Sequence, residues 1–191
     1  LYEYIAARTN FLDQIFRPAL ARHIPQIVLL GAGYDTRAYR FAPHSSTTHI
    51  FEVDAPATQR AKRAGLARAQ IAPPPGTHFV PLDLNHDDLG DALGAAGFST
   101  RRTTLFIWEG VTMYLTAAAV DATLAFIRHN TPAGSTVAFD YAYRSAVTGK
   151  GDYYGAKQVI RYTRLLGEPY RFGIGEAGSD VRGQLRHGDG R

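Results

Sequence analysis

The motif Gly31-Ala32-Gly33 directly follows a short apolar segment, residues 26–30. Glycines at such a point let the backbone turn tightly and let a ligand come close to it. A dinucleotide-binding fingerprint has Gly or Ala at the sixth place of the motif, where this sequence has Thr36. The motif therefore indicates a nucleotide site without a pyrophosphate cradle. The alternative is a plain tight turn into a helix.

A carboxylate follows the second apolar segment, residues 49–53, at Asp54. An ionised carboxylate only accepts hydrogen bonds, so it suits the two hydroxyls of a ribose. Glu52 points to the same side of the expected strand, but Asp54 lies nearer its end and is the better candidate. The alternative role for Asp54 is to cap the helix that begins at Pro56.

Two further strand ends carry acids. Asp83 follows the third segment and would hold an adenine amino group, with Leu84 packing on the ring; the alternatives are a surface turn and a core residue. Glu109 follows the fourth segment and would face the ammonium of an amino-acid ligand, or would serve only as a surface acid. Tyr114 would line a substrate pocket or belong to the core.

These residues need elements that bring them together, and the hydropathy pattern supplies such elements. The expected strands are residues 26–30, 49–53, 77–82, 103–108 and 135–141, and the expected helices are 2–21 with a break or bend near Pro18, a brief one capped by Asp35, 56–69, 89–96, one begun by Thr116, and 156–166. Alternating strands and helices predict an α/β fold, a doubly wound sheet with all five strands parallel. Ligands of such sheets bind at the carboxyl ends of the strands.

The composition excludes several classes of protein. The chain has 191 residues, 45% hydrophobic and 20% charged, which is typical of one globular domain. It has no cysteine, which excludes disulfides and thiolate metal sites and is compatible with the cytoplasm, where we expect it. No apolar run is long enough for a membrane helix, and a net charge of +4 with scattered basic residues does not indicate a nucleic-acid partner.

Three segments carry a resemblance to a known family: LLGAGYDTRAYR (29–40), FEVDAP (51–56) and EGVTMYL (109–115). They resemble the leucine carboxyl methyltransferase-like family, in its bacterial branch of S-adenosylmethionine-dependent methyltransferases. The resemblance runs from about Ile5 to Ile174 and implies a class I methyltransferase fold, Rossmann-like, with S-adenosylmethionine as cofactor.

The resemblance also implies site residues. Arg8, in the motif Ala7-Arg8-Thr9, would pair with the cofactor carboxylate, and Gly31 would face its methionine portion. Asp54 would bind the ribose, Asp83 and Leu84 the adenine, and Glu109 would sit near the methionine end. With Gly33, these are the candidate cofactor-binding residues: Arg8, Gly31, Gly33, Asp54, Asp83, Leu84 and Glu109.

The chain departs from the family at both ends. Members usually have a longer stretch before the Ala-Arg-Thr motif and continue beyond residue 174 into a helix and further strands. We therefore expect a methyltransferase domain at residues 1–174, incomplete at both ends and lacking its last strands, and a poorly structured tail at 175–191, which is rich in glycine and poor in large apolar residues.

The expected function is methyl transfer to a carboxyl or hydroxyl oxygen of a small molecule or a peptide terminus. No residue stands out as a catalytic base, because His23, His86 and His129 are isolated, and no spacing suggests a metal site. One alternative is a non-catalytic remnant of a methyltransferase. Another is a NAD(P)-dependent oxidoreductase, against which Thr36 and the Glu109-Gly110 pair argue.

Overall fold

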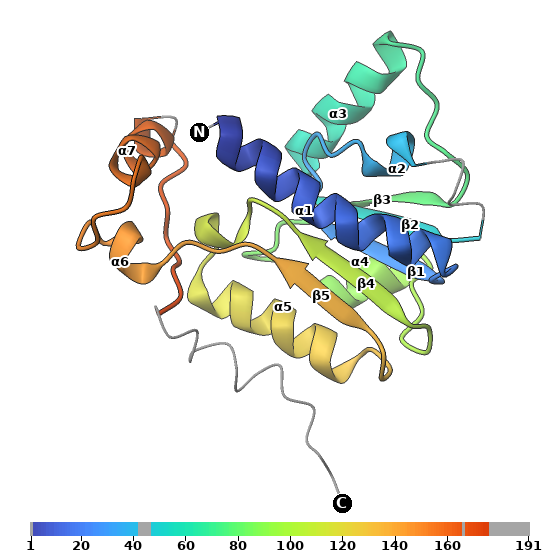
Figure 1. The fold of residues 1–191 in the computed structure, drawn as a ribbon. Coiled ribbons are helices and arrows are strands. Elements are labelled where there is room, and N and C mark those ends of the chain that lie inside the picture. The colour runs from blue at the N-terminus through green and yellow to red at the C-terminus, as the bar shows by residue number, and fades with distance from the viewer. Residues whose placement is uncertain (1, 42–46, 166, 176–191) are drawn as a thin grey trace, which may run out of the picture.

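The computed structural model describes residues 2–41, 47–165 and 167–175, which form a three-layer structure around one sheet (Figure 1). The strands are β1 (Gln26–Leu30), β2 (His49–Asp54), β3 (Thr77–Pro81), β4 (Thr104–Trp108) and β5 (Thr136–Phe139). They lie in the order β3-β2-β1-β4-β5, and every neighbouring pair is parallel. The predicted doubly wound parallel sheet is confirmed.

The neighbouring strands β1 and β4 are buried along their whole length. Gln26 of β1 lies opposite Thr104 of β4, and Leu30 lies opposite Trp108. Burial on both faces explains their continuous apolar character. The edge strand β5 is shorter than the predicted 135–141 at both ends; at its start, the Ser135 backbone N–H donates to the Pro132 carbonyl in the preceding turn at 3.1 Å.

One face of the sheet is covered by α1 (Tyr2–Ala21), α2 (Arg37–Arg40) and α3 (Pro56–Arg68). Leu12, Phe16 and Leu20 of α1 belong to the apolar cluster on this face. Of the break or bend expected near Pro18, the break is wrong, since α1 continues to Ala21. A proline this near the end of a helix removes a single hydrogen bond, and the Pro18 carbonyl still accepts one from Arg22 at 3.0 Å.

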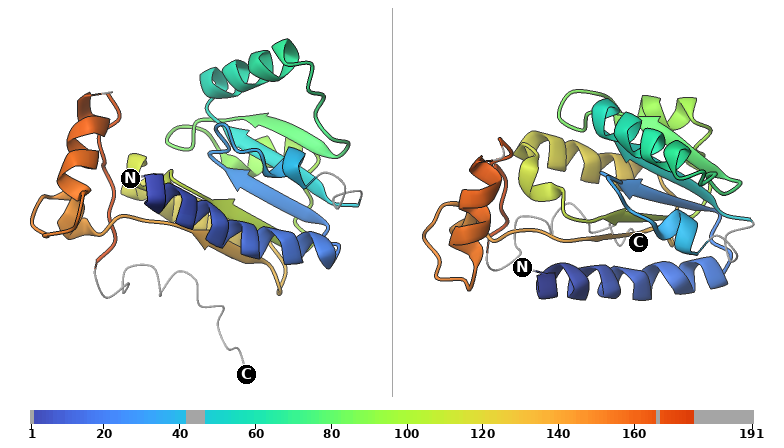
Figure 2. Two further views of the ribbon diagram at one scale, coloured as in Figure 1. Left: turned by 45° about the horizontal axis from the view of Figure 1, so that its top comes forward. Right: turned by 90° about the horizontal axis from the view of Figure 1, so that it is seen from above.

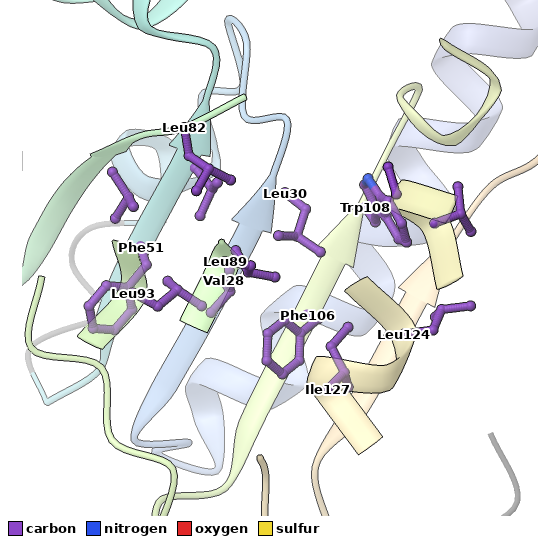
Figure 3. Packing of buried hydrophobic residues seen from close by; sticks show 14 of the residues in the cluster. Val28, Leu30, Phe51, Leu82, Leu89, Leu93, Phe106, Trp108, Leu124 and Ile127 are labelled. Atoms are coloured by element: carbon purple, nitrogen blue, oxygen red, sulfur yellow. The ribbon is translucent and has the colours of Figure 1, made fainter. Parts of the chain in front are cut away.

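The other face is covered by α4 (Leu89–Ala95) and α5 (Ala117–His129), and Figure 2 shows α1 and α5 on opposite sides of the strands. Thr116 caps α5 as predicted, its hydroxyl accepting the Ala119 N–H. The main apolar core lies between these helices and the sheet; Figure 3 labels Val28, Leu30, Phe51, Leu82, Leu89, Leu93, Phe106, Trp108, Leu124 and Ile127 in it. This core holds the strands in place, and with them the carboxyl ends of the strands.

Beyond β5 the chain forms a small layer beside the first turns of α1. It contains α6 (Arg144–Val147) and α7 (Ala156–Leu165), and Ile174 pairs with Tyr143 in an isolated bridge (Figure 1). A short 3-10 helix, η2 (Thr112–Tyr114), follows β4. The tail expected at 175–191 lies, apart from Gly175, outside the described residues. Among the helices described, none is long and apolar enough to cross a membrane.

Candidate functional site

Two cavities lie at the carboxyl ends of the strands, and Gly31 and Gly33 line both of them. The arginine cavity, about 420 Å³, is lined by Arg8, Thr9, Asp35, Arg37 and Glu109 besides the two glycines. The aspartate cavity, about 590 Å³, is lined by Asp54, Asp83, Leu84, Val111 and Tyr114. The structure thus brings all seven predicted site residues to one edge of the sheet, divided between two adjoining cavities.

The glycines are required by the backbone itself. Gly31 has φ +66° and Gly33 has φ +44°, in the left-handed region that favours glycine. A Cβ on Gly31 would overlap the Cγ2 methyl of Val111. The loop after β1 therefore packs directly against the loop after β4, and Gly31 is what allows that contact.

Asp54 projects from the end of β2 into the aspartate cavity. Its Oδ2 accepts the Gly33 N–H at 2.6 Å and its Oδ1 accepts the Ala55 N–H at 2.7 Å. Burial raises the pKa of this carboxyl against the effect of these two donors. The N-cap of α3 is Ala55, so the helix-capping alternative for Asp54 is wrong. Each carboxylate oxygen keeps one lone pair for a further donor.

Glu52, the competing acid on β2, has a different place. Its side chain is buried and forms an ion pair with Lys62 of α3 at 2.7 Å. Lys62 also donates to the Asp35 carbonyl at 2.7 Å. Through Lys62, Glu52 therefore connects β2 to α3 and to the loop after β1. Glu52 lines neither cavity, which supports the preference for Asp54 as the ligand-facing acid.

Asp83 and Leu84 lie on the far wall of the aspartate cavity. Asp83 Oδ1 accepts the Asn85 N–H at 2.9 Å, and the Asp83 N–H donates to Asp87 at 2.9 Å. These bonds hold the turn after β3, so the surface-turn role exists. Within the described chain, Asp83 Oδ2 has no protein partner and is available to a donor in the cavity.

Glu109 is surrounded by cations. Its Oε1 accepts from Arg8 Nε at 3.0 Å and from the Thr9 hydroxyl at 2.9 Å, and its Oε2 pairs with Arg37 Nη2 at 2.7 Å. Burial opposes ionisation, but Arg37, Thr9 and Arg8 together lower the pKa of Glu109 below its ordinary value. Glu109 is thus an ionised anchor for two arginines at the end of β4.

Arg8 reaches from α1 across the strand ends. Besides Glu109, its Nη1 pairs with Asp140 at 2.9 Å. A Cβ on Gly110 would lie 2.9 Å from Arg8 Nη2, so Gly110 leaves room for the guanidinium. In the part of the chain that the structure describes, Nη2 has no acid partner, and it faces the site with one donor group to spare.

Two participants were missed by reasoning from the sequence. Arg37, in the motif after β1, is 2% exposed and binds Asp13, Asp35 and Glu109 at 2.6–2.8 Å. Asp140, the residue after β5, accepts the Gly110 N–H and pairs with Arg8. The rule that found Asp54, an acid directly after a strand, missed Asp140 because the predicted fifth strand, 135–141, extends past it, whereas β5 ends at Phe139.

The described residues include no ready-made base or metal centre. His86 lines the aspartate cavity but is exposed, and no cluster of three or more metal-binding side chains occurs in the described ranges. The arrangement provides hydrogen-bond acceptors for hydroxyls, a spare guanidinium donor and glycine-lined backbone. It is suited to binding a nucleoside joined to an amino acid.

Comparisons with known proteins agree with this arrangement. The profile of the family described as "Leucine carboxyl methyltransferase" matches residues 1–128. A Mycobacterium marinum protein named "Putative S-adenosyl-L-methionine-dependent methyltransferase" is 41% identical over 138 residues, which are 72% of this chain and 44% of that protein. The chain spans about half the length of the curated relatives it matches.

Solved structures agree on the fold. A DUF574 family protein from Streptomyces avermitilis superposes with a TM-score of 0.67 at 15% identity, covering 92% of this chain and 66% of that one. Magnesium protoporphyrin IX methyltransferase from Synechocystis PCC 6803, solved with bound SAH, gives 0.54 at 13% identity, covering 92% and 70%. The predicted class I methyltransferase fold is confirmed.

Proposed function

Because the chain belongs to the leucine carboxyl methyltransferase family, we propose that it binds S-adenosylmethionine and transfers the methyl group to a carboxyl or hydroxyl oxygen. We assign this binding to one domain, residues 1–174. The acceptor is a small molecule or a peptide terminus. The names of the relatives support the cofactor, and the site residues support its orientation.

The Asp54 carboxylate carries the proposal. The Gly33 and Ala55 N–H groups hold its two oxygens and leave one lone pair free on each. Two free acceptors on one carboxylate suit a ligand with two adjacent hydroxyls, as in a ribose. Asp83 and Leu84 lie beside it for the adenine. The nucleoside therefore occupies the aspartate cavity.

The methionine portion extends toward the arginine cavity, past the glycines that line both cavities. There the spare Nη2 of Arg8 pairs with the cofactor carboxylate. Glu109 lies beside it and contributes negative charge near the ammonium. Because Glu109 is already bonded to three side chains, its main task is to hold Arg8 in place.

The bound cofactor supplies an electrophilic methyl group: an acceptor oxygen forms the new O–C bond while the C–S bond breaks and its electron pair stays on sulfur. The residues of this chain align acceptor and methyl group, which is a large part of the rate enhancement available. A carboxylate acceptor has no proton to lose, whereas a hydroxyl acceptor releases one during the transfer.

Calorimetry with the 191-residue chain tests the proposal by comparing S-adenosylhomocysteine with NAD. S-adenosylhomocysteine should bind with one site per chain, and NAD should not. Binding of NAD alone would favour the oxidoreductase, against which Thr36 argues. Binding of neither would identify a remnant that has lost its ligand.

A further inference from the structure

A third cavity lies beyond the two described so far. The tyrosine cavity, about 400 Å³, is enclosed by the first turn of α1, η2, the loop after β5 and α7, and it is lined by Tyr4, Met113, Tyr141, Val159 and Tyr170 among others. Figure 1 shows α7 beside the N-terminal end of α1. Tyr4 is 53% exposed and Tyr141 37%, so aromatic rings gather around an open mouth.

A few side chains separate the tyrosine cavity from the proposed cofactor site. The Tyr170 ring meets the Tyr114 ring edge-on, with centroids 5.2 Å apart, and Tyr114 lines the aspartate cavity. On the other side, the Tyr4 hydroxyl donates to Asp140 at 3.4 Å, and Asp140 pairs with Arg8 of the arginine cavity. The tyrosine cavity thus borders the aspartate cavity through Tyr114 and the arginine cavity through Asp140 and Arg8.

The charges around the tyrosine cavity disfavour an anion. Glu3 is the one charged side chain among its described lining residues. The Arg8 guanidinium lines the neighbouring arginine cavity and is already shared by Glu109 and Asp140. A carboxylate buried here would lose its hydration without gaining a cation, which is strongly unfavourable.

The cavity does offer partners to a neutral hydroxyl. Tyrosine hydroxyls both donate and accept hydrogen bonds. Burial, reinforced by Tyr114, raises the pKa of Tyr170 to about 12, so this phenol stays protonated near neutral pH. The rings of Tyr4, Tyr141 and Tyr170 provide edges and faces for another aromatic ring.

We propose that the tyrosine cavity binds the methyl acceptor, and that this acceptor is an uncharged molecule in which an apolar aromatic ring carries a hydroxyl group. The inference rests on the proposed function, because a methyl donor must occupy the neighbouring cavities. In the transfer, the hydroxyl oxygen forms the bond to the methyl carbon, the C–S bond breaks with its electron pair on sulfur, and the hydroxyl proton passes to water.

The test compares 1-naphthol with 1-naphthoate, which share a ring and differ in charge at pH 7. Calorimetry with the full chain and S-adenosylhomocysteine should show saturable binding of 1-naphthol and at least about tenfold weaker binding of 1-naphthoate, a difference of about 1.4 kcal/mol. Equal affinities would overturn the inference that the acceptor is uncharged.

Variants locate the binding. Val159→Asp puts a charge on the lining face of α7, and Ala146→Leu fills the cavity without a charge; each should weaken 1-naphthol binding about tenfold or more. Gln158→Asp, exposed on the same helix and outside the lining, is the matched control and should bind normally. Binding of 1-naphthol that neither Val159→Asp nor Ala146→Leu weakens would overturn the assignment to this cavity.

The two proposals fail separately. All three variants should keep the parent affinity for S-adenosylhomocysteine, because Ala146, Gln158 and Val159 line neither cofactor cavity. If S-adenosylhomocysteine binds and 1-naphthol does not, the acceptor inference falls and the proposed function stands. If 1-naphthol binding responds to the variants but S-adenosylhomocysteine does not bind, the methyltransferase proposal falls and the cavity remains a ligand site.

Discussion

Asp54 and Arg8 stand at opposite ends of the proposed cofactor, and each is prepared for its task by a different kind of neighbour. Backbone N–H groups of Gly33 and Ala55 orient the Asp54 carboxylate. Carboxylates of Glu109 and Asp140 orient the Arg8 guanidinium. Substitutions at the two positions should therefore affect different parts of the same ligand.

Asp54→Ala should weaken the binding of both S-adenosylhomocysteine and adenosine by about 1.5–3 kcal/mol, the usual contribution of a hydrogen bond to a charged group. Asp83→Ala should have a smaller effect, because an adenine amino group is a neutral donor. Arg8→Met should weaken S-adenosylhomocysteine but not adenosine, which lacks the carboxylate. Calorimetry with both ligands measures this, with the exposed Asp152→Ala as control. Adenosine affinity that survives Asp54→Ala but not Arg8→Met would mean that the ligand lies reversed.

Arg37 offers a prediction about stability. Replacing it with Met leaves Asp13, Asp35 and Glu109 without their shared cation, and unfolding should become about 3–5 kcal/mol easier, as for other broken buried pairs. Arg40→Met on the same helix is the matched control: its side chain is 41% exposed and forms an ion pair with Asp13 at the surface, so the loss should stay below about 1 kcal/mol. Urea unfolding compares the two variants, and equal losses would contradict the role assigned to Arg37.

At the residue level, the sequence identified the residues that line the two cavities better than the residues that support them. Asp54 and Glu109 were found because each follows a strand, a position that parallel topology makes meaningful. Arg37 and Asp13 were not found, because a buried ion pair between α1 and α2 depends on how two helices pack. No local pattern distinguishes Arg37 from an exposed helix arginine.

Among the elements, the loops after β1 and β4 depend on each other. Gly31→Ala would place a methyl group against Val111 in a backbone region that disfavours alanine. Unfolding should become easier by about 1–3 kcal/mol, the range for overpacking. Gly94→Ala in α4, with open space around its Cβ, should instead stabilise by about 0.5–1 kcal/mol. Denaturant unfolding measures the free energy of unfolding of both variants. If Gly31→Ala is as stable as the parent, the loop after β1 moves to accommodate the methyl group and the prediction is wrong.

The element boundaries show what a sequence pattern determines. The sequence predicted the Thr116 cap and the buried central strands correctly, because capping and apolar runs are local signals. It predicted β5 too long, and it predicted a break or bend near Pro18, where α1 continues to Ala21. The Ser135 N–H is used by a turn, and Pro18 is tolerated because few residues of α1 follow it. Both errors concern hydrogen bonds that hydropathy does not report.

For the molecule as a whole, the lowered pKa of Glu109 links stability to pH. A carboxyl whose folded pKa lies below its unfolded value, 4.5, stabilises the fold above that pH and loses the contribution as the pH falls. The unfolding free energy of the parent should exceed that of Glu109→Gln at pH 7, and the difference should shrink as the pH drops below about 4.5. Comparing the two proteins removes the opposite contributions of Glu52 and Asp54, whose pKa values burial raises. A difference that stays constant from pH 7 to pH 3 would refute the assignment.

Two different kinds of interaction, ionic and apolar, hold helix α1 against the rest of the domain. Near its start Arg8 is held by charge, and farther on Leu12, Phe16 and Leu20 are held by apolar burial. Dissolved salt weakens attraction between charges, whereas cold weakens the burial of apolar surface. At low temperature and low salt, the ionic contacts of Arg8 are therefore weakened less than the apolar contacts of Leu20. At higher temperature and high salt the reverse holds. Salt should therefore loosen the end of α1 that lines the arginine cavity, and cold should loosen the opposite end.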